Sequence, residues 1–249
     1  PSWPDPRRVV SGAGGSARIH GNTITGALGI ASDGTTSAGI IVTTYYGAGT
    51  QATIGNNTIT GNTAAVDVGY DNNDTSNVVA FNNDFSGNGV ELESTNATQD
   101  FTGNYWGTTD DAAILGLMTG VDAGSVNFST FLTNGPDADP ASLGFQGDFS
   151  HLIVTSLGGG TNRLGEAVSE VDAGGTINVN AGTYTLPSTL VIDKSLSLVG
   201  AGEGATTIDG SGVNNNYAMR VKADDISLSG FTLEAGANTW GGMSVFSQT

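Results

Sequence analysis

Short clusters in which apolar and polar residues alternate occur along most of the chain. Two examples are Thr176–Val179 and Leu196–Val199. Alternation with a period of two is typical of β-strands that bury one face. Gly, Asn, Asp or Pro separates the clusters, and these residues favour tight turns. The pattern therefore predicts many short strands and no long amphipathic helix.

One phrase recurs four times in the first half of the chain, with an Asn followed closely by an apolar residue. The four copies are Asn22 with Ile24, Asn57 with Ile59, Asn83 with Phe85, and Asn104 with Tyr105 or Trp106. A repeat of this kind predicts coils wound about a common axis, because one coil cannot bury its apolar face alone. We expect the apolar residues to point inward in one column, with layers about 4.8 Å apart. We expect the Asn side chains to form ladders at the bends.

The second half is organised differently. Residues 134–150 are rich in Asp and Pro and are predicted to be a linker. Asn162 is predicted to cap a short helix near 162–171 that covers an open end of the strand stack. The apolar face of this helix consists of Leu164, Ala167, Val168 and Val171. Short strands follow, from Thr176 to Leu233.

Both halves resemble the pectate-lyase-like right-handed parallel β-helix repeats of bacterial and archaeal surface proteins. Residues 173–185, 192–202 and 206–210 are similar to the first coils of such a domain, and residues 103–114 and 126–132 to its last coils and cap. The resemblance implies an all-β, right-handed parallel β-helix, or solenoid, in which a helix caps the first coils. It implies little about function, because this scaffold carries lyases, hydrolases, adhesins and structural stalks.

The order of the two halves implies how the chain is divided. Residues 1–133 would be the C-terminal coils and cap of one β-helix, 134–150 a linker, and 151–249 the N-terminal cap and first coils of a second. A piece of a tandem array, a circularly permuted helix, and subunits stacked end to end all fit this order. Without such an arrangement, both open ends would present unpaired strand edges. We expect self-association or adjacent β-helix units to pair with these edges, and closure of the chain on itself is the alternative.

Charge and composition exclude several classes of protein. The 24 acidic and seven basic residues give a net charge of −17, which disfavours nucleic-acid binding. The chain has no Cys, so disulfides and thiolate metal sites are excluded. No apolar stretch is long enough to span a membrane. Together with the resemblance, these features predict an extracellular or cell-surface location.

No catalytic or cofactor-binding residue is predicted. Asp110 and Asp111 form an adjacent acidic pair, but Asp110 suits the N-cap of a helix, and Asp224 with Asp225 suits a turn. The Arg220–Lys222 element resembles an Arg-x-Lys motif of galacturonan hydrolases whose companion motifs are missing here. His20 and His151 have no second ligand at zinc spacing.

Two further groups of residues are candidates for binding. Asp71 and Asp74 have side-chain oxygens that calcium accepts, although the same residues favour a tight turn. Trp3 and Trp240 would stack on sugar rings if exposed, whereas Trp106 is expected in the core. Asn-x-Ser/Thr sequences occur at Asn56, Asn73, Asn96 and Asn127.

Two functions agree with this sequence. The first is a structural or adhesive module of a secreted or cell-surface protein that assembles end to end into a filament or long array. The alternative is a carbohydrate-active β-helix enzyme or a carbohydrate-binding module.

Overall fold

The structure is a computed structural model that describes residues 9–11, 15–30, 36–45, 48–70, 73–92 and 97–246. It is an all-β chain of stacked parallel strands that form a β-solenoid of about eight turns, as the sequence predicts. The chain divides into two compact units.

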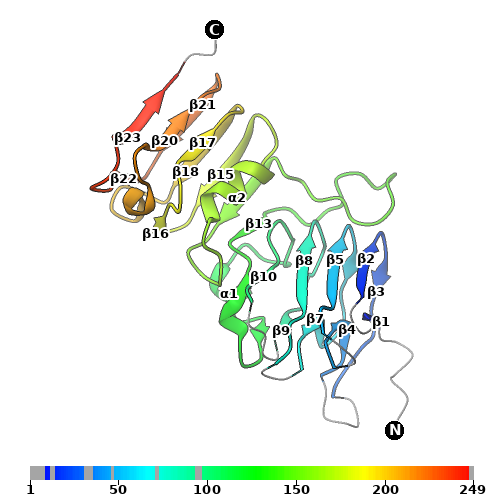
Figure 1. Cartoon of the computed structure of the whole chain (residues 1–249). Coiled ribbons are helices and arrows are strands. Elements are labelled where there is room, and N and C mark those ends of the chain that lie inside the picture. The colour runs from blue at the N-terminus through cyan, green and yellow to red at the C-terminus, as the bar shows by residue number, and fades with distance from the viewer. Residues whose placement is uncertain are drawn as a thin grey trace. The chain divides into compact units, whose positions relative to one another are not determined.

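The first unit contains most of the chain up to Asp148. Its strands run parallel in stacked layers, coloured blue to green in Figure 1. One sheet has the order β1 (Val9–Ser11), β4 (Ala38–Val42), β7 (Ala64–Val68), β9 (Val90–Leu92) and β11 (Met118–Thr119). A second has the order β12 (Val126–Asn127), β10 (Gln99–Asp100), β8 (Asn77–Phe81), β5 (Gln51–Gly55) and β2 (Ser16–His20), and β3 (Thr23–Ile24) pairs with β6 (Thr58–Ile59). The short elements α1 (Asp111–Leu115) and η1 (Ala123–Ser125) follow β10 and β11.

The core of the first unit contains the predicted column of apolar residues. Ile24 pairs in register with Ile59, and bridges from Thr58 to Asp84 and from Asp84 to Tyr105 continue the same register. Ile59 and Phe85 are fully buried, and Trp106, not Tyr105, takes the inward position of the next layer. The Phe85 and Trp106 ring centroids lie 5.1 Å apart. The predicted inward register is therefore confirmed, with Ile24 half-buried in the end layer.

The predicted asparagine ladder is present. The Asn104 Oδ1 accepts hydrogen bonds from the backbone N and the Nδ2 of Asn83, both at 2.9 Å. The Asn83 Oδ1 accepts the same pair from Asn57 at 3.0 and 2.9 Å, and the Asn57 Oδ1 accepts it from Asn22 at 3.0 and 3.1 Å. A second ladder joins Asn62 to Asn88. Each ladder satisfies buried polar groups at a bend.

The backbone at this bend explains the residue that precedes each ladder Asn. Gly21, Asn56, Asn82 and Gly103 all have a positive φ between 58° and 70°. Gly adopts this left-handed conformation freely and Asn tolerates it better than most residues. The repeated Gly-Asn and Asn-Asn pairs in the sequence are therefore the signature of the corner.

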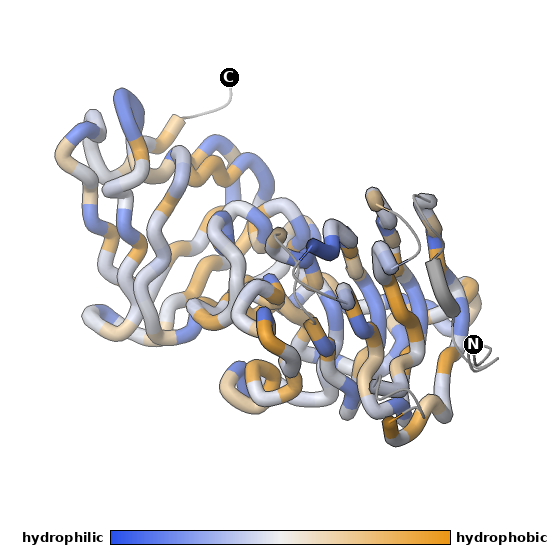
Figure 2. The backbone as a smooth tube through the Cα atoms, turned by 60° about the horizontal axis from the view of Figure 1, so that its bottom comes forward, coloured by the Kyte–Doolittle hydropathy of each residue, from blue (hydrophilic) through white to orange (hydrophobic). Residues whose placement is uncertain are grey.

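The second unit contains three more parallel sheets. The largest has the order β13 (Thr130–Leu132), β14 (His151–Val154), β15 (Gly175–Val179), β18 (Leu196–Gly200) and β21 (Ile226–Ser229). The others are β16 (Gly182–Thr185), β19 (Thr206–Asp209) and β22 (Thr232–Glu234), and β17 (Leu190–Ile192), β20 (Tyr217–Val221) and β23 (Gly241–Val245). The turn η2 (Gly210–Gly212) follows β19. Hydrophobic and hydrophilic residues alternate along these strands in Figure 2.

The predicted short helix is α2 (Arg163–Glu170), which packs against β14 and β17. Leu164, Ala167, Val168 and Val171 are buried, as its apolar pattern indicates. The predicted capping by Asn162 is wrong in one respect, because the Asn162 side chain makes no capping hydrogen bond. Only its backbone carbonyl accepts a hydrogen bond, from the Glu166 N–H at 2.9 Å.

Residues 134–150, expected to be a linker, lie for most of their length along the corner of the first unit. The Asn56 side chain donates hydrogen bonds to the Phe145 carbonyl at 3.2 Å and to Gln146 Oε1 at 2.9 Å. The Gly147 N–H donates to Asn82 Oδ1 at 2.6 Å, and Phe145 is buried. Residues 132–148 belong to the first unit for this reason, whereas 129–131 and 149–156 belong to the second.

Candidate functional site

The acidic pairs have structural roles. The Asp110 carboxylate accepts hydrogen bonds from the N–H groups of Ala112 and Ala113 at 3.0 and 3.2 Å, so Asp110 caps α1 as predicted. Asp224 and Asp225 lie exposed in the bend before β21, where Asp225 has a φ of 56°. In the described part of the chain, no group of three or more His, Asp or Glu side chains is placed to hold a metal ion.

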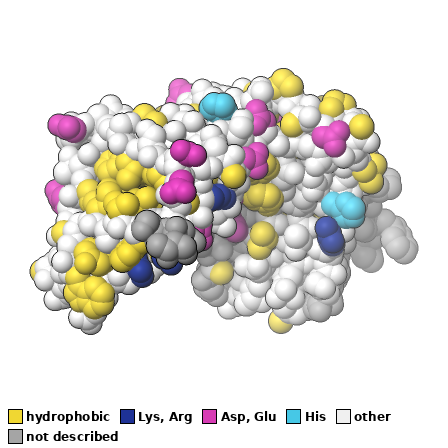
Figure 3. All heavy atoms as spheres, turned by 90° about the horizontal axis from the view of Figure 1, so that it is seen from above, with side chains coloured by type: hydrophobic (Ala, Val, Ile, Leu, Met, Phe, Trp, Pro, Cys, Tyr) yellow, Lys and Arg dark blue, Asp and Glu magenta, His cyan; other side chains and the backbone are white. Residues whose placement is uncertain are grey.

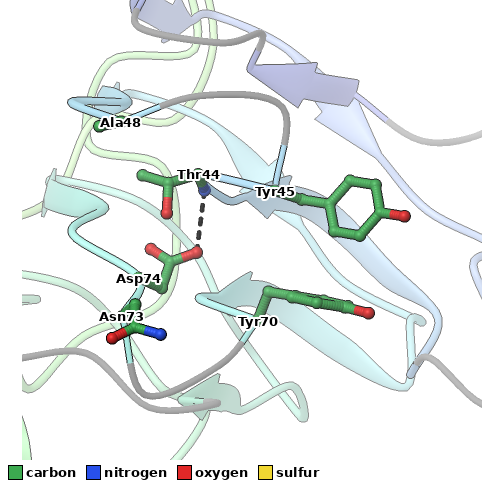
Figure 4. Close-up of a pocket in the computed structure, with 6 residues that line it drawn as sticks. All are labelled: Thr44, Tyr45, Ala48, Tyr70, Asn73 and Asp74. Carbon is green, nitrogen blue, oxygen red and sulfur yellow. Dashed lines mark hydrogen bonds between the residues drawn. The ribbon is translucent and has the colours of Figure 1, made fainter.

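A pocket of about 360 Å³ lies in the first unit where the chain leaves β4 and β7. Figure 4 shows the six residues that line it, and they come from two successive turns of the solenoid. The lining residues are Thr44, Tyr45, Ala48, Tyr70, Asn73 and Asp74. The volume is at the lower end of the roughly 300–1,000 Å³ typical of small-ligand sites.

Two tyrosines form one side of this pocket. The Tyr45 and Tyr70 ring centroids are 4.6 Å apart, and the ring planes meet at 75°. Each side chain is 57% exposed, and in Figure 4 both rings extend in the same direction from neighbouring turns. Exposed aromatic rings bury poorly solvated surface when a ligand covers them, so they favour binding.

Asp74 holds the two turns of the pocket together. Its Oδ2 accepts hydrogen bonds from the Thr44 N–H at 2.8 Å and the Thr43 hydroxyl at 3.1 Å, and its Oδ1 accepts one from the Ser76 N–H at 2.7 Å. Burial of the carboxyl group raises the pKa of Asp74, but the hydrogen bonds from Ser76 and Thr44 outweigh it and the pKa is lowered.

These contacts bear on the predicted calcium site. Asp74 is 1% exposed, and both of its oxygens accept hydrogen bonds from the turn. Asp71 lies outside the described residues. Calcium binding by this pair stays a prediction, and the geometry of Asp74 is that of a turn-forming residue.

The remaining candidates are not among the described residues that line the pocket. His20 ends β2 and His151 begins β14, and both are exposed. Arg220 lies over the Phe246 ring, with Cζ 4.7 Å from the centroid. Trp240 is 67% exposed and packs edge-on against Tyr217, whereas Trp3 lies outside the described residues.

The Asn-x-Ser/Thr sequences differ in exposure. Asn73 is exposed, while Asn127 is buried and the Nδ2 of Asn56 donates hydrogen bonds to residues 145 and 146. Asn96 lies outside the described residues. Of the three that are described, Asn73 alone presents an exposed side chain to a glycosylating enzyme.

Sequence reasoning missed the tyrosine pair and one pair of acids. Asp67 and Glu91 are neighbours in register on β7 and β9, although they are 24 positions apart in a chain with no regular period. Tyr45 and Tyr70 each follow an apolar cluster by a few residues. A tyrosine shortly after each of the two strands was the one available signal.

The end layers of the two units form another candidate surface. Inward positions that are buried in inner layers become more exposed there. Buried Leu198 pairs with half-buried Leu228, and buried Val221 pairs with Val245, which is 74% exposed. In the first unit, fully buried Ile54 is followed by half-buried Ile19. Figure 3 shows a hydrophobic area on the second unit, at the left of the view.

Comparison with family models, curated proteins and solved structures yields no match to this chain. No helix of the described residues is long and apolar enough to cross a membrane.

Proposed function

We propose that this chain is a structural and adhesive module of the pectate-lyase-like β-helix type, from a secreted or cell-surface protein, whose end layers are continued by further β-helix coils. The observation that carries the proposal is the exposure of inward-facing apolar positions in the end layers. Met219 is fully buried, whereas its partner Met243 in the next layer is 39% exposed. The column of side chains continues to the edge of the unit and stops without a covering element among the described residues.

The backbone supports the same proposal. Among the described strands, β21, β22 and β23 each have a partner on one side, so the hydrogen-bonding groups of their outer edges meet no other described strand. An edge of this kind is a template for another strand. Another β-solenoid layer satisfies both the backbone edge and the apolar column, because its own strands have the same spacing.

A contact between two different end surfaces repeats head to tail, so it produces a filament unless rotation closes a ring. The acidic surface adds selectivity. At a charge of −17, lateral association is opposed by repulsion, whereas end-to-end association gains apolar burial and strand pairing. The resulting assembly is a long, thin stalk, a form suited to display on a surface.

Sedimentation velocity and light scattering over a concentration series test the proposal. We expect the 249-residue chain to associate as its concentration rises, and Leu228→Lys to weaken that association strongly. Ser227→Lys is the matched control. It introduces the same charge on the same strand, but at an exposed position that points outward. Circular dichroism verifies that both variants fold.

Two results would contradict the structural role. The first is a strictly monomeric chain at high concentration whose end-strand amides are protected from hydrogen exchange. The second is enzymatic: new reducing ends or unsaturated sugars after incubation with acidic or neutral polysaccharides and calcium would favour the alternative, a carbohydrate-active enzyme.

A further inference from the structure

We propose that the pocket between the turns after β4 and β7 binds one sugar ring of a neutral polysaccharide, with Tyr45 and Tyr70 as the stacking surface. The proposal does not depend on end-to-end assembly, because the pocket lies on loops and not on an end layer. It gives the module a ligand of defined chemistry.

The two tyrosine rings are arranged as a corner that a flat ligand can fill. The two rings meet at 75° with centroids 4.6 Å apart, so they form two walls of a corner. Each ring is more than half exposed despite the contact between them. A flat-sided ligand that rests on one ring and abuts the other covers both walls. A pyranose ring has this form.

The faces of the two aromatic rings attract the C–H groups of a sugar. The face of an aromatic ring is the negative end of its quadrupole. One face of a pyranose presents C–H groups whose hydrogens carry partial positive charge, so it is attracted to the ring face. The hydroxyl groups around the edge of the sugar need hydrogen-bonding partners. Thr44 and Asn73 are the neutral polar side chains among the described lining residues, and a hydroxyl and an amide can each take part in more than one hydrogen bond.

Charge determines which sugars fit. None of the described residues that line the pocket is a Lys or an Arg, and the net charge of −17 repels anions. The structure therefore favours a neutral sugar over a uronic acid. A quaternary ammonium ion would also be attracted to the ring faces. The carboxylate among the described lining residues, Asp74, is 1% exposed and accepts three hydrogen bonds from Thr43, Thr44 and Ser76, so it is not directed at a bound cation.

Asp74 is a positioning residue for this pocket. Its carboxylate accepts hydrogen bonds from the Thr43 hydroxyl and the Thr44 N–H, which immediately precede Tyr45 in the chain. The carboxylate thus holds the backbone that carries Tyr45. A ring held in place before binding loses little freedom on contact with a sugar.

Affinity electrophoresis in gels that contain a single neutral polysaccharide tests the proposal. Laminarin, xylan, galactomannan and hydroxyethylcellulose are the probes, and polygalacturonate is the anionic comparison. We expect retardation by at least one neutral polymer and none by polygalacturonate. Tyr45→Ala and Tyr70→Ala should each weaken binding by about tenfold, because each removes one aromatic wall.

Trp240→Ala is the matched control, because Trp240 is the other strongly exposed aromatic described, 67% exposed, and lies in the second unit. We expect it to leave binding unchanged. Tyr70→Phe keeps the ring and should retain most of the affinity, which separates loss of stacking from misfolding. Thermal melts verify that each variant folds.

Three results would overturn the proposal. The first is the absence of retardation by every neutral polymer. The second is binding that Trp240→Ala removes and the tyrosine variants do not. The third is a tyrosine-dependent response to tetramethylammonium without any response to sugars, which would identify the pocket as a cation site.

Discussion

Replacing Asn83 by Ala tests the asparagine ladder as the element that holds the first unit in register. Asn83 is fully buried in the middle of the ladder. Its Oδ1 accepts two hydrogen bonds from Asn57, and its Nδ2 donates to Asn104 Oδ1 at 2.9 Å, to the Ile54 carbonyl at 2.9 Å and to the Phe81 carbonyl at 3.1 Å. Alanine removes all of these contacts.

The loss can be estimated group by group. The backbone N–H of buried Asn57 has Asn83 Oδ1 as its acceptor, and a buried donor left without a partner costs about 1–3 kcal/mol. The other lost hydrogen bonds contribute about 0.5–1.5 kcal/mol each, less where the partner retains a second bond. We expect the free energy of unfolding to fall by about 3–5 kcal/mol, a large part of the roughly 5–15 kcal/mol of a typical domain.

Asn22→Ala in the same ladder is the control. Asn22 is exposed in the end layer, and its backbone N–H still donates to Asn57 Oδ1 after the substitution. No buried group loses its last partner, so we expect a loss of about 1 kcal/mol or less. Urea denaturation followed by circular dichroism gives both values, and hydrogen exchange at the Asn57 amide reports the local opening. Equal losses for the two variants would refute the reasoning.

Three further predictions follow from buried positions. Ile59→Asp should destabilise the first unit by several kcal/mol, because an unpaired charge would replace a fully buried side chain; an unchanged melting temperature would show that the column is not the core. Gly89→Ala should destabilise the protein, since a Cβ there would lie 1.8 Å from the Leu117 carbonyl oxygen. Gly124→Ala is the control: its Cβ would have no neighbouring atom within 4 Å, so its free energy of unfolding should stay within about 0.5 kcal/mol of the parent. Because the pKa of Asp74 is lowered on folding, its carboxylate stabilises the protein above its unfolded-state pKa, near 3.9, and this contribution is lost as the pH falls through the lower folded-state pKa. Stability curves of the parent and of Asp74→Asn should differ at neutral pH and converge in acid, and parallel curves would contradict the assignment.

Much of the fold could be predicted because the determinants are local. Alternation of apolar and polar residues specifies a strand, and a strand buried on one face has its register fixed by that alternation. The recurrence of Asn22, Asn57, Asn83 and Asn104 supplied the register between layers, because identical amides pair with one another when coils stack. The Gly or Asn before each of them marks the left-handed corner.

The sequence by itself therefore determined the strands, the inward column and the ladder, while tertiary structure decided what the loops do. Tyr45 and Tyr70 are neighbours only because coils of unequal length bring the ends of β4 and β7 into adjacent layers. The course of residues 134–148 depends on Asn56 and Asn82, whose side chains form hydrogen bonds with Phe145 and Gly147 at the corner. Asn162 begins α2 without a side-chain cap. The physical reason is the distance along the sequence over which each effect acts. Strand and turn preferences act over a few residues, whereas a pocket or a returning segment depends on contacts between residues far apart in the sequence. The lengths of the intervening loops control those contacts.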